Sequence, residues 1–243
     1  VAVFRRDANG DLERINSVDI DGMRGCHLST DEEGKYLFVA GYHDGKVTVV
    51  HTHRDGRLGS VVTGVFHKGL GSVGERNFRP HVSCVRPTPD NKYLCAVDNG
   101  IDQIKIYRVN RRTKRLELVD ILRCHRESGP KKMKFSKDGK FAYLIYELNN
   151  TIQVYRYDGS GKNPVFELLQ TESTLASHDD ETHDATSGLC MSPDDKYVFC
   201  STAGEDTVAM YKRDEQTGLL EKQCILPISG NYPKDLAVFP DGK

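Results

Sequence analysis

Three side chains in the sequence have the types that hydrolysis of an ester bond needs: His81, Lys131 and Glu147. The reaction needs a base that activates water and a cation that stabilises the oxyanion developing on the carbonyl group. His81 or Glu147 could be the base, and Lys131 could be the cation. The alternative is structural: a cross-strand ion pair between Lys131 and Glu147, with His81 bonded to a loop carbonyl.

A short block that recurs along the chain indicates the elements that position these residues. It consists of an acidic turn with Gly or Asn, then Lys, an aromatic residue and an apolar run. Its lysines, here called the anchor lysines, are separated by about 57, 48, 56 and 47 residues and are Lys35, Lys92, Lys140, Lys196 and Lys243. Asp- and Gly-bearing turns between apolar segments are typical of β-hairpins.

The segments around each block predict further strands. An alternating segment follows about ten residues later, as at 103–107 (QIKIY), and a fourth, weaker one follows another turn, as at 115–119 (RLELV). Apolar residues keep no 3.6-residue period over three turns, so few helices are expected. Four antiparallel strands repeated about every 50 residues are typical of β-propeller blades, and a β-sandwich has no reason to repeat one turn. We predict an all-β propeller of four-stranded blades, with each anchor lysine just after the first hairpin.

The repeat also predicts which residues lie at the mouth of the central channel. The first strand of a propeller blade lines the channel and the second returns beside it, so the start of one and the end of the other share a face. Counting nine residues back and seven forward from the anchor lysines gives Cys26 with Tyr42, Ser83 with Asn99, Lys131 with Glu147, Ser187 with Ala203, and Lys234 unpaired. We expect Lys131 and Glu147 within salt-bridge or one-water distance, with His81 opening onto the same pocket.

Several motifs lie in register from repeat to repeat: 39–49 (VAGYHDGKVTV), 79–90 (RPHVSCVRPTPD), 97–107 (VDNGIDQIKIY), 129–135 (GPKKMKF), 146–152 (YELNNTI) and 233–242 (PKDLAVFPDG). Together they resemble the seven-bladed lactonase family, which includes propeller-type 6-phosphogluconolactonases and fungal carboxy-muconate cyclases. The resemblance runs along nearly the whole chain and implies a seven-bladed β-propeller, of which this sequence covers about five blades.

The resemblance implies a His, an Arg and a Glu as the catalytic groups. His81 and Glu147 match this pattern, whereas Lys131 stands where the family has Arg. Lys is a point charge and lacks the bidentate fork of Arg. Two further family residues are replaced, a second His by Ser83 and a second Arg by Ala203. The expected substrate-binding residues are Tyr42, Arg79, Ser83, Asn99 and Lys234, of which Arg79 and Lys234 could hold a carboxylate or phosphate.

Three functions remain open on these residues. The first is hydrolysis of a sugar lactone, with 6-phosphogluconolactone as one candidate. The second is a lactonising isomerase, which protonates an alkene while a carboxylate closes on it. The third is a propeller that acts only as a binding platform, its site decayed. The expected partner is a small lactone or carboxylate, and no cofactor or metal is expected.

Length and composition set the class of protein. A chain of 243 residues buries roughly 70–75% of its unfolded surface, enough for a real core. A net charge of −1 provides no global field for nucleic acid or an acidic membrane. The longest apolar runs are about six residues, far below the roughly 20 that cross a bilayer. The seven cysteines include no C-x-x-C pair and mostly follow strand-like patterns, so we expect reduced core residues in a cytoplasmic protein.

Other patterns have simpler interpretations. His51 and His53 could ligate a metal but fit an exposed strand, and segment 177–184 (SHDDETHD) fits a solvated loop. Asp98 and Asp102 fit turns. We expect residues 1–243 to form one propeller domain that is incomplete at both ends, because family members are about a hundred residues longer and an open ring exposes strand edges.

Overall fold

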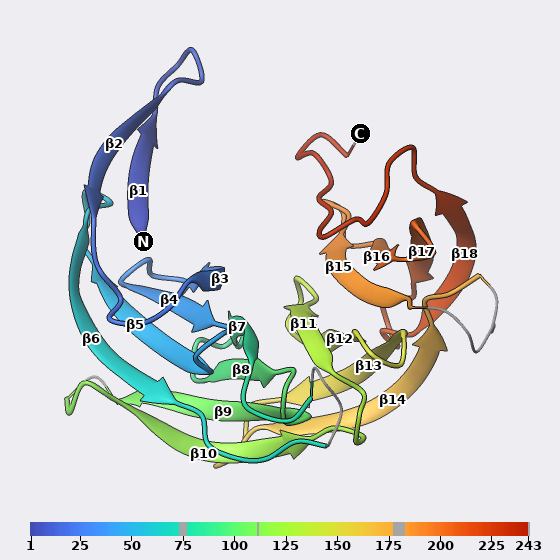
Figure 1. Cartoon of the computed structure of the whole chain (residues 1–243), viewed down its shortest axis with the longest axis horizontal. Helices are drawn as coiled ribbons and strands as arrows, with labels where there is room; N and C mark the ends of the chain where they lie inside the picture. The colour runs from blue at the N-terminus through green and yellow to red at the C-terminus, as the bar shows by residue number, and fades with distance from the viewer. Residues whose placement is uncertain (73–76, 111, 177–182, 243) are drawn as a thin grey trace.

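Four antiparallel sheets of four strands follow one another around an arc, with one two-stranded sheet before them (Figure 1). The computed structural model describes residues 1–72, 77–110, 112–176 and 183–242. These residues form eighteen strands. In this described part no helix is long and apolar enough to span a bilayer. The all-β propeller prediction is confirmed.

Each four-stranded sheet, here called a blade, follows chain order from an inner to an outer strand. Blade 1 consists of β3 (Gly25–Thr30), β4 (Tyr36–Gly41), β5 (Lys46–Thr52) and β6 (Leu58–Phe66). Blade 2 consists of β7 (Val82–Pro87), β8 (Leu94–Asp98), β9 (Gln103–Asn110) and β10 (Arg115–Arg123). Blade 3 consists of β11 (Pro130–Phe135), β12 (Phe141–Tyr146), β13 (Thr151–Asp158) and β14 (Val165–Ser173). Blade 4 consists of β15 (Ala185–Met191), β16 (Tyr197–Ala203), β17 (Thr207–Arg213) and β18 (Leu220–Pro227).

The recurring turn closes the first hairpin of every blade, as predicted. The residue directly before each of the first four anchor lysines has a positive φ: Gly34 (62°), Asn91 (56°), Gly139 (72°) and Asp195 (65°). Gly, Asn and Asp tolerate this backbone region best, which explains why the repeat keeps these residue types there. The fifth anchor lysine, Lys243, lies outside the described residues.

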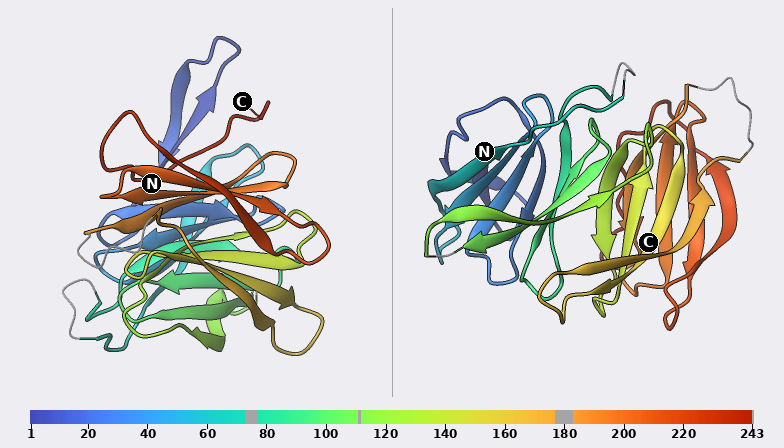
Figure 2. Two further views of the ribbon diagram at one scale, coloured as in Figure 1. Left: turned by 90° about the vertical axis from the view of Figure 1, so that its right-hand side faces the viewer. Right: turned by 90° about the horizontal axis from the view of Figure 1, so that it is seen from below.

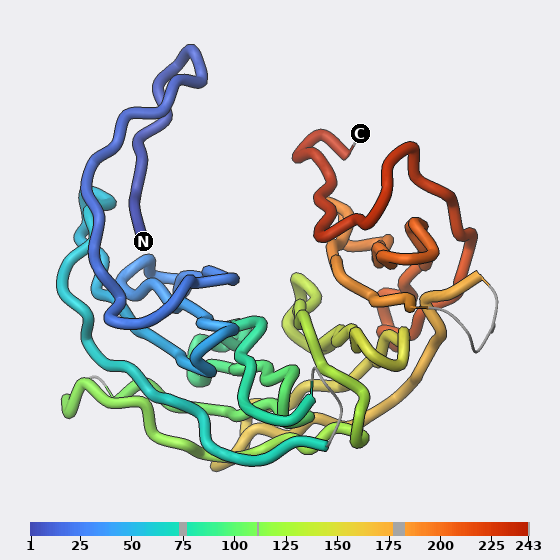
Figure 3. The backbone as a smooth tube through the Cα atoms, viewed as in Figure 1, coloured from blue at the N-terminus to red at the C-terminus, as the bar shows by residue number. Residues whose placement is uncertain are grey.

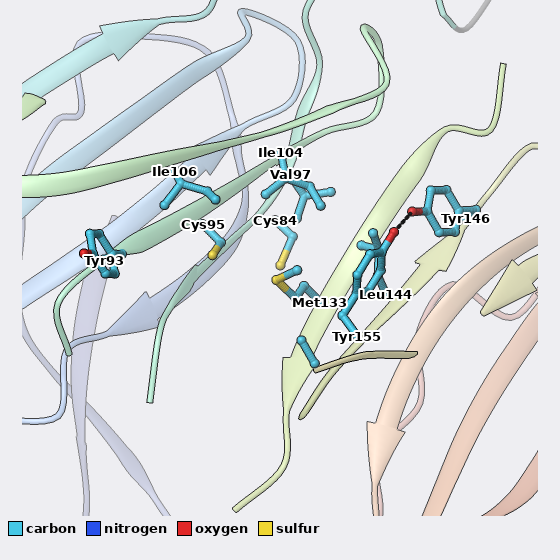
Figure 4. Packing of buried hydrophobic residues seen from close by; sticks show 11 residues of the cluster. Cys84, Tyr93, Cys95, Val97, Ile104, Ile106, Met133, Leu144, Tyr146 and Tyr155 are labelled. Atoms are coloured by element: carbon cyan, nitrogen blue, oxygen red, sulfur yellow. Dashed lines mark hydrogen bonds between the residues drawn. The ribbon is translucent and has the colours of Figure 1, made fainter. Parts of the chain in front are cut away.

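The hydrophobic core is divided among the interfaces between blades. Between blades 2 and 3, Cys84, Ile104, Met133 and Leu144 are fully buried and belong to one apolar cluster (Figure 4). Similar clusters join blade 1 to blade 2 and blade 3 to blade 4. The flat faces of adjacent blades therefore stabilise each other, as the side views of the stacked sheets illustrate (Figure 2).

The cysteines take part in this core to different degrees. All seven are free thiols; four are buried, Cys124 and Cys224 are half-buried, and Cys26 is exposed. Burial raises the pKa of Cys124 to about 12. The prediction of core cysteines is therefore confirmed for four of them and wrong for Cys26.

The two ends of the chain lie on opposite sides of the opening of the arc (Figure 3). A hairpin of β1 (Ala2–Arg6) and β2 (Leu12–Ser17) precedes blade 1, and its Val1 and Val3 pack against the apolar cluster around Val39. Residues 228–242 follow blade 4 without a strand. Completion of the ring by further residues stays a prediction.

Candidate functional site

A β-bulge occurs at the same place in the inner hairpin of every blade. The pairing register shifts by one between Gly25 and His27, Val82 and Cys84, Pro130 and Lys132, and Thr186 and Gly188. The extra residues are Cys26, Ser83, Lys131 and Ser187, the set that the anchor lysines had placed at the channel mouth. Bulges leave one residue unpaired and re-aim its side chain, so this position presents one side chain per blade to the channel.

Three of the four bulge residues use their side chains to join their blade to the next segment. Cys26 is exposed as a residue, but its sulfur lies 3.4 Å from the Val82 carbonyl oxygen. Desolvation of the sulfur there, followed by nearby Cys84, raises the pKa of the thiol to about 11, so it stays protonated as a donor. The Ser83 hydroxyl donates to the Lys131 carbonyl at 2.8 Å, and Ser187 donates to the Pro233 carbonyl. Lys131 is the exception, because its ammonium group remains within its own blade.

The Lys131 ammonium group binds Glu147, as predicted. Its Nζ lies 2.6 Å from Oε1, and 22% of the lysine side chain and 11% of the glutamate side chain are exposed. The other carboxylate oxygen, Oε2, accepts a hydrogen bond from Asn99 Nδ2 at 3.0 Å. Asn99 Nδ2 also lies 3.2 Å from the Gly129 carbonyl, so blade 2 holds the carboxylate of blade 3 in place.

These groups open onto a cavity of about 230 Å³. Its walls include four of the residues predicted for the site, and the full lining is Tyr42, Lys131, Glu147, Ala185, Ser187, Ala203, Tyr232 and Lys234. The volume equals roughly eight water molecules at about 30 Å³ each, which suits one small molecule rather than a polymer. Ser83 and Asn99 lie behind this wall, bonded to Lys131 and Glu147.

His81 lies behind Tyr42 and not in the cavity lining, which differs from the expectation. The two rings stack with centroids 4.4 Å apart, and His81 Nδ1 lies 2.8 Å from the Tyr42 carbonyl oxygen. A carbonyl can only accept, so Nδ1 carries a proton in this contact. The contact with a loop carbonyl is the one that the structural alternative had predicted.

A buried contact between His67 and Asp98 is connected to the His81 backbone. His67 Nδ1 lies 2.6 Å from Asp98 Oδ2, and neither side chain is exposed. Asp98 Oδ1 accepts the backbone N–H groups of His81, at 2.7 Å, and Gly100, at 3.1 Å. Burial lowers the pKa of His67, and the hydrogen bond to Asp98 opposes this shift. Asp98 was predicted to form a turn; it is the last residue of β8, and its bond to Gly100 shapes the turn that follows. His67 gave no signal in the sequence because its partner is 31 residues away.

Two cationic residues expected to bind substrate differ in position. Lys234 lines the cavity, and its Nζ lies 4.5 Å from the ring centroid of Tyr232. Arg79 is exposed, contacts the Phe78 ring and does not line the cavity, so its predicted place at the site is not observed. Tyr232 was missed because it lies in a segment without repeat register, where its φ is 61°.

A larger cavity of about 590 Å³ lies beside the loop that enters β11. Its wall includes Asp102, whose carboxylate accepts the backbone N–H groups of Glu127 and Gly129 at 2.8 and 2.9 Å. Asp102 therefore stabilises this loop, in agreement with the predicted turn role. Its carboxylate is committed to the backbone, so the smaller cavity, where a cation and a carboxylate meet, is the stronger candidate for chemistry.

The remaining patterns do not form a site among the described residues. His51 and His53 have ring centroids 5.1 Å apart, and no group of three or more potential metal ligands exists in that part of the chain. Residues 177–182 of the acidic segment lie outside the described residues. His51 and His53 are therefore not supported as a metal site.

Comparisons with known proteins agree with this architecture. The family model described as "Lactonase, 7-bladed beta-propeller" matches residues 1–243. The chain is 30% identical to the 6-phosphogluconolactonase of Bacillus subtilis (strain 168) over 242 residues, which are 99% of this chain and 67% of that protein. The structure of the Pseudomonas aeruginosa periplasmic gluconolactonase is 29% identical, with a TM-score of 0.91, over 99% of this chain and 68% of that one. A Lactobacillus plantarum structure is 26% identical, with a TM-score of 0.87, over 99% and 68% of the two chains.

Proposed function

Because the chain belongs to the seven-bladed β-propeller lactonase family, we propose that it hydrolyses the lactone of a sugar acid. The observation that carries the proposal is the contact between Lys131 and Glu147 on the wall of a small cavity. In the other three described blades, neither of the two corresponding residues is a cation or a carboxylate. The B. subtilis relative makes 6-phosphogluconolactone one candidate substrate.

The proposed reaction uses Glu147 as the general base. A water molecule in the cavity loses a proton to the carboxylate while its oxygen attacks the lactone carbonyl. The Lys131 ammonium group, 2.6 Å from Glu147 Oε1, stabilises the oxyanion that forms. The ring C–O bond then breaks, and the proton moves from Glu147 to the leaving oxygen, which gives an open-chain hydroxy acid and restores the carboxylate.

The neighbours of the pair support this division of roles. Asn99 fixes the orientation of the carboxylate through Oε2, which leaves the Oε1 side directed to Lys131. Lys234 adds a second cation to the cavity wall and is the proposed contact for a carboxylate or phosphate of the substrate. His81 is proposed to act through Tyr42, because Tyr42 and not His81 contributes to the wall.

One observation favours the binding-platform function. Ala203, in place of a charged residue, lines the cavity, and the catalytic cation has its own carboxylate as partner. A platform would bind a sugar acid without turning over its lactone.

Cytoplasmic localisation stays a prediction.

The test is hydrolysis of glucono-δ-lactone and its 6-phosphate, followed by acid release in a weakly buffered indicator assay. We expect both rates to exceed spontaneous opening, and the phosphorylated lactone to have the lower KM if Lys234 contacts the phosphate. Absence of turnover on both substrates, combined with saturable binding of gluconate, would instead support the platform.

A further inference from the structure

A third cavity lies at the opposite end of the inner strands. Its volume is about 410 Å³, and its wall is formed by the ends of β7, β11 and β15 with the turns that follow them. Arg86 and Lys134 are on this wall. Lys134 follows Lys131 by three residues along β11, which corresponds to about 10 Å at about 3.3 Å per residue. The cavity is therefore separate from the Lys131–Glu147 site.

Arg86 and Lys134 occupy the same register position on adjacent blades. Each lies six residues before an anchor lysine, Lys92 or Lys140. The corresponding residues of blades 1 and 4 are Ser29 and Cys190, so the two cations are a local feature and not a property of the repeat. The guanidinium group of Arg86 reaches toward β11, where its Nε lies 3.4 Å from the Met133 carbonyl oxygen.

Neither cation has a carboxylate within ion-pair distance among the described residues. The nearby acidic groups have other partners. Asp195, on the same wall, lies 3.2 Å from Arg213 Nη1, and Asp235 lies 2.6 Å from Lys132 Nζ. Two half-buried positive charges therefore face one cavity, and no carboxylate of the described residues forms an ion pair with either of them.

His27 lies beside Arg86 and affects the charge around this cavity. Its Nε2 lies 3.4 Å from Arg86 Nη2. Burial, followed by the charges of Arg86 and Lys132, lowers the pKa of His27 to about 4, so the ring is neutral at pH 7. Its Nδ1 accepts the backbone N–H group of Val85 at 3.4 Å. Burial and the charge of Arg86 likewise lower the pKa of Lys134. His27 therefore adds no positive charge beside Arg86, and the charges of Arg86 and Lys134 repel each other.

We propose that Arg86 and Lys134 form a binding site for a small oxyanion, a phosphate or a carboxylate, at the end of the channel opposite Lys131 and Glu147. The guanidinium fork matches two oxygens of such an anion, and the ammonium group adds a point charge from the next blade. The cavity has room for an organic acid or a phosphorylated metabolite. This site does not depend on lactone hydrolysis.

The experiment is calorimetric titration of the protein with inorganic phosphate and, separately, with acetate. We expect saturable phosphate binding in about the millimolar range, and the better-bound of the two anions identifies the preferred class. Arg86→Gln and Lys134→Gln should each weaken it by about tenfold or more, the loss of one charge-assisted contact. Arg86→Lys should retain part of the affinity. The matched control is Lys222→Gln, which removes an exposed cation of β18 outside both cavities and should leave phosphate affinity within about twofold. Lys131→Gln shows whether phosphate binds at the Lys131–Glu147 cavity instead.

Three results would overturn the proposal. They are no saturable binding of either anion to the wild-type protein, unchanged affinity in folded Arg86→Gln and Lys134→Gln variants, and loss of affinity in Lys131→Gln alone. Circular dichroism of each variant establishes that it is folded. Because the readout is anion binding, a protein that hydrolyses no lactone still tests the proposal.

Discussion

Glu147→Gln is the substitution that separates chemistry from structure at the candidate site. Gln has almost the same shape as Glu but cannot take up a proton from water. If Glu147 is the general base, the change should lower kcat for glucono-δ-lactone by about 100-fold or more, the scale for loss of a positioned base. That factor corresponds to about 2.7 kcal/mol of lost transition-state stabilisation.

The effect of Glu147→Gln on stability should be smaller. The carboxylate accepts from Lys131 Nζ at Oε1 and from Asn99 Nδ2 at Oε2, whereas an amide offers only one oxygen. One donor therefore loses its acceptor. A flip of the Asn99 amide does not restore the bond, because Nδ2 also contacts the Gly129 carbonyl at 3.2 Å and a flip would place Oδ1 against that oxygen. We expect a cost of about 1–2 kcal/mol in the free energy of unfolding, measured by urea denaturation.

Glu167→Gln is the matched control. Glu167 forms a cross-strand pair with Arg156 on the same blade, also at 2.6 Å, but both side chains are more than half exposed and the pair is outside the cavity lining. It should change neither turnover nor stability by a measurable amount. A folded Glu147→Gln variant with wild-type turnover, like the control, would refute the assignment of Glu147 as base.

Three further predictions concern single residues. Lys131→Arg should preserve or raise kcat/KM for the lactone, because it restores the residue of the family pattern; a 100-fold loss would contradict this. Asp98→Asn should lower the free energy of unfolding by about 2–3 kcal/mol, since the buried His67 and two backbone amides lose a charged acceptor, and urea denaturation measures it. Burial lowers the pKa of His27 in the folded protein to about 4, below its unfolded value near 6.5. The contribution of His27 to stability is therefore complete above pH 6.5 and is lost as the pH falls toward 4. Wild-type stability should therefore decrease over that window more steeply than that of His27→Gln; equal slopes would contradict the assignment.

The fold was predictable because the first hairpin of each repeat requires particular residue types at a fixed position. The residue before each anchor lysine needs a positive φ, and this need restricts it to Gly, Asn or Asp, which makes the hairpin visible in the sequence. The spacing from that hairpin to the bulge is constant. Counting from the anchor therefore placed Lys131 and Glu147 together correctly, although their contact depends on side-chain geometry.

The parts of the site that lie outside the repeat were not predictable in this way. Arg79 and His81 precede β7, in a segment whose path depends on stacking between Tyr42 and His81 and on the buried Asp98. Counting along strands gives no information on such contacts. Tyr232 lies in an irregular segment after β18, and the counting rule identified its neighbour Lys234 only because that residue keeps the register. The Arg86 and Lys134 pair does share a register position, so the same count from the anchors could have found it.

The inner bulge also bears on how such a protein can change over evolution. Cys26, Ser83, Lys131 and Ser187 are unpaired in their ladders, so exchanging one of them alters the channel mouth without removing a ladder hydrogen bond or a residue of the apolar clusters between blades. New specificities can therefore arise by single substitutions on an unchanged scaffold. A combinatorial library at these four codons would sample that chemistry directly. Substitutions at the buried Ser83 and Ser187, whose hydroxyl groups bond to the next segment, should be tolerated least.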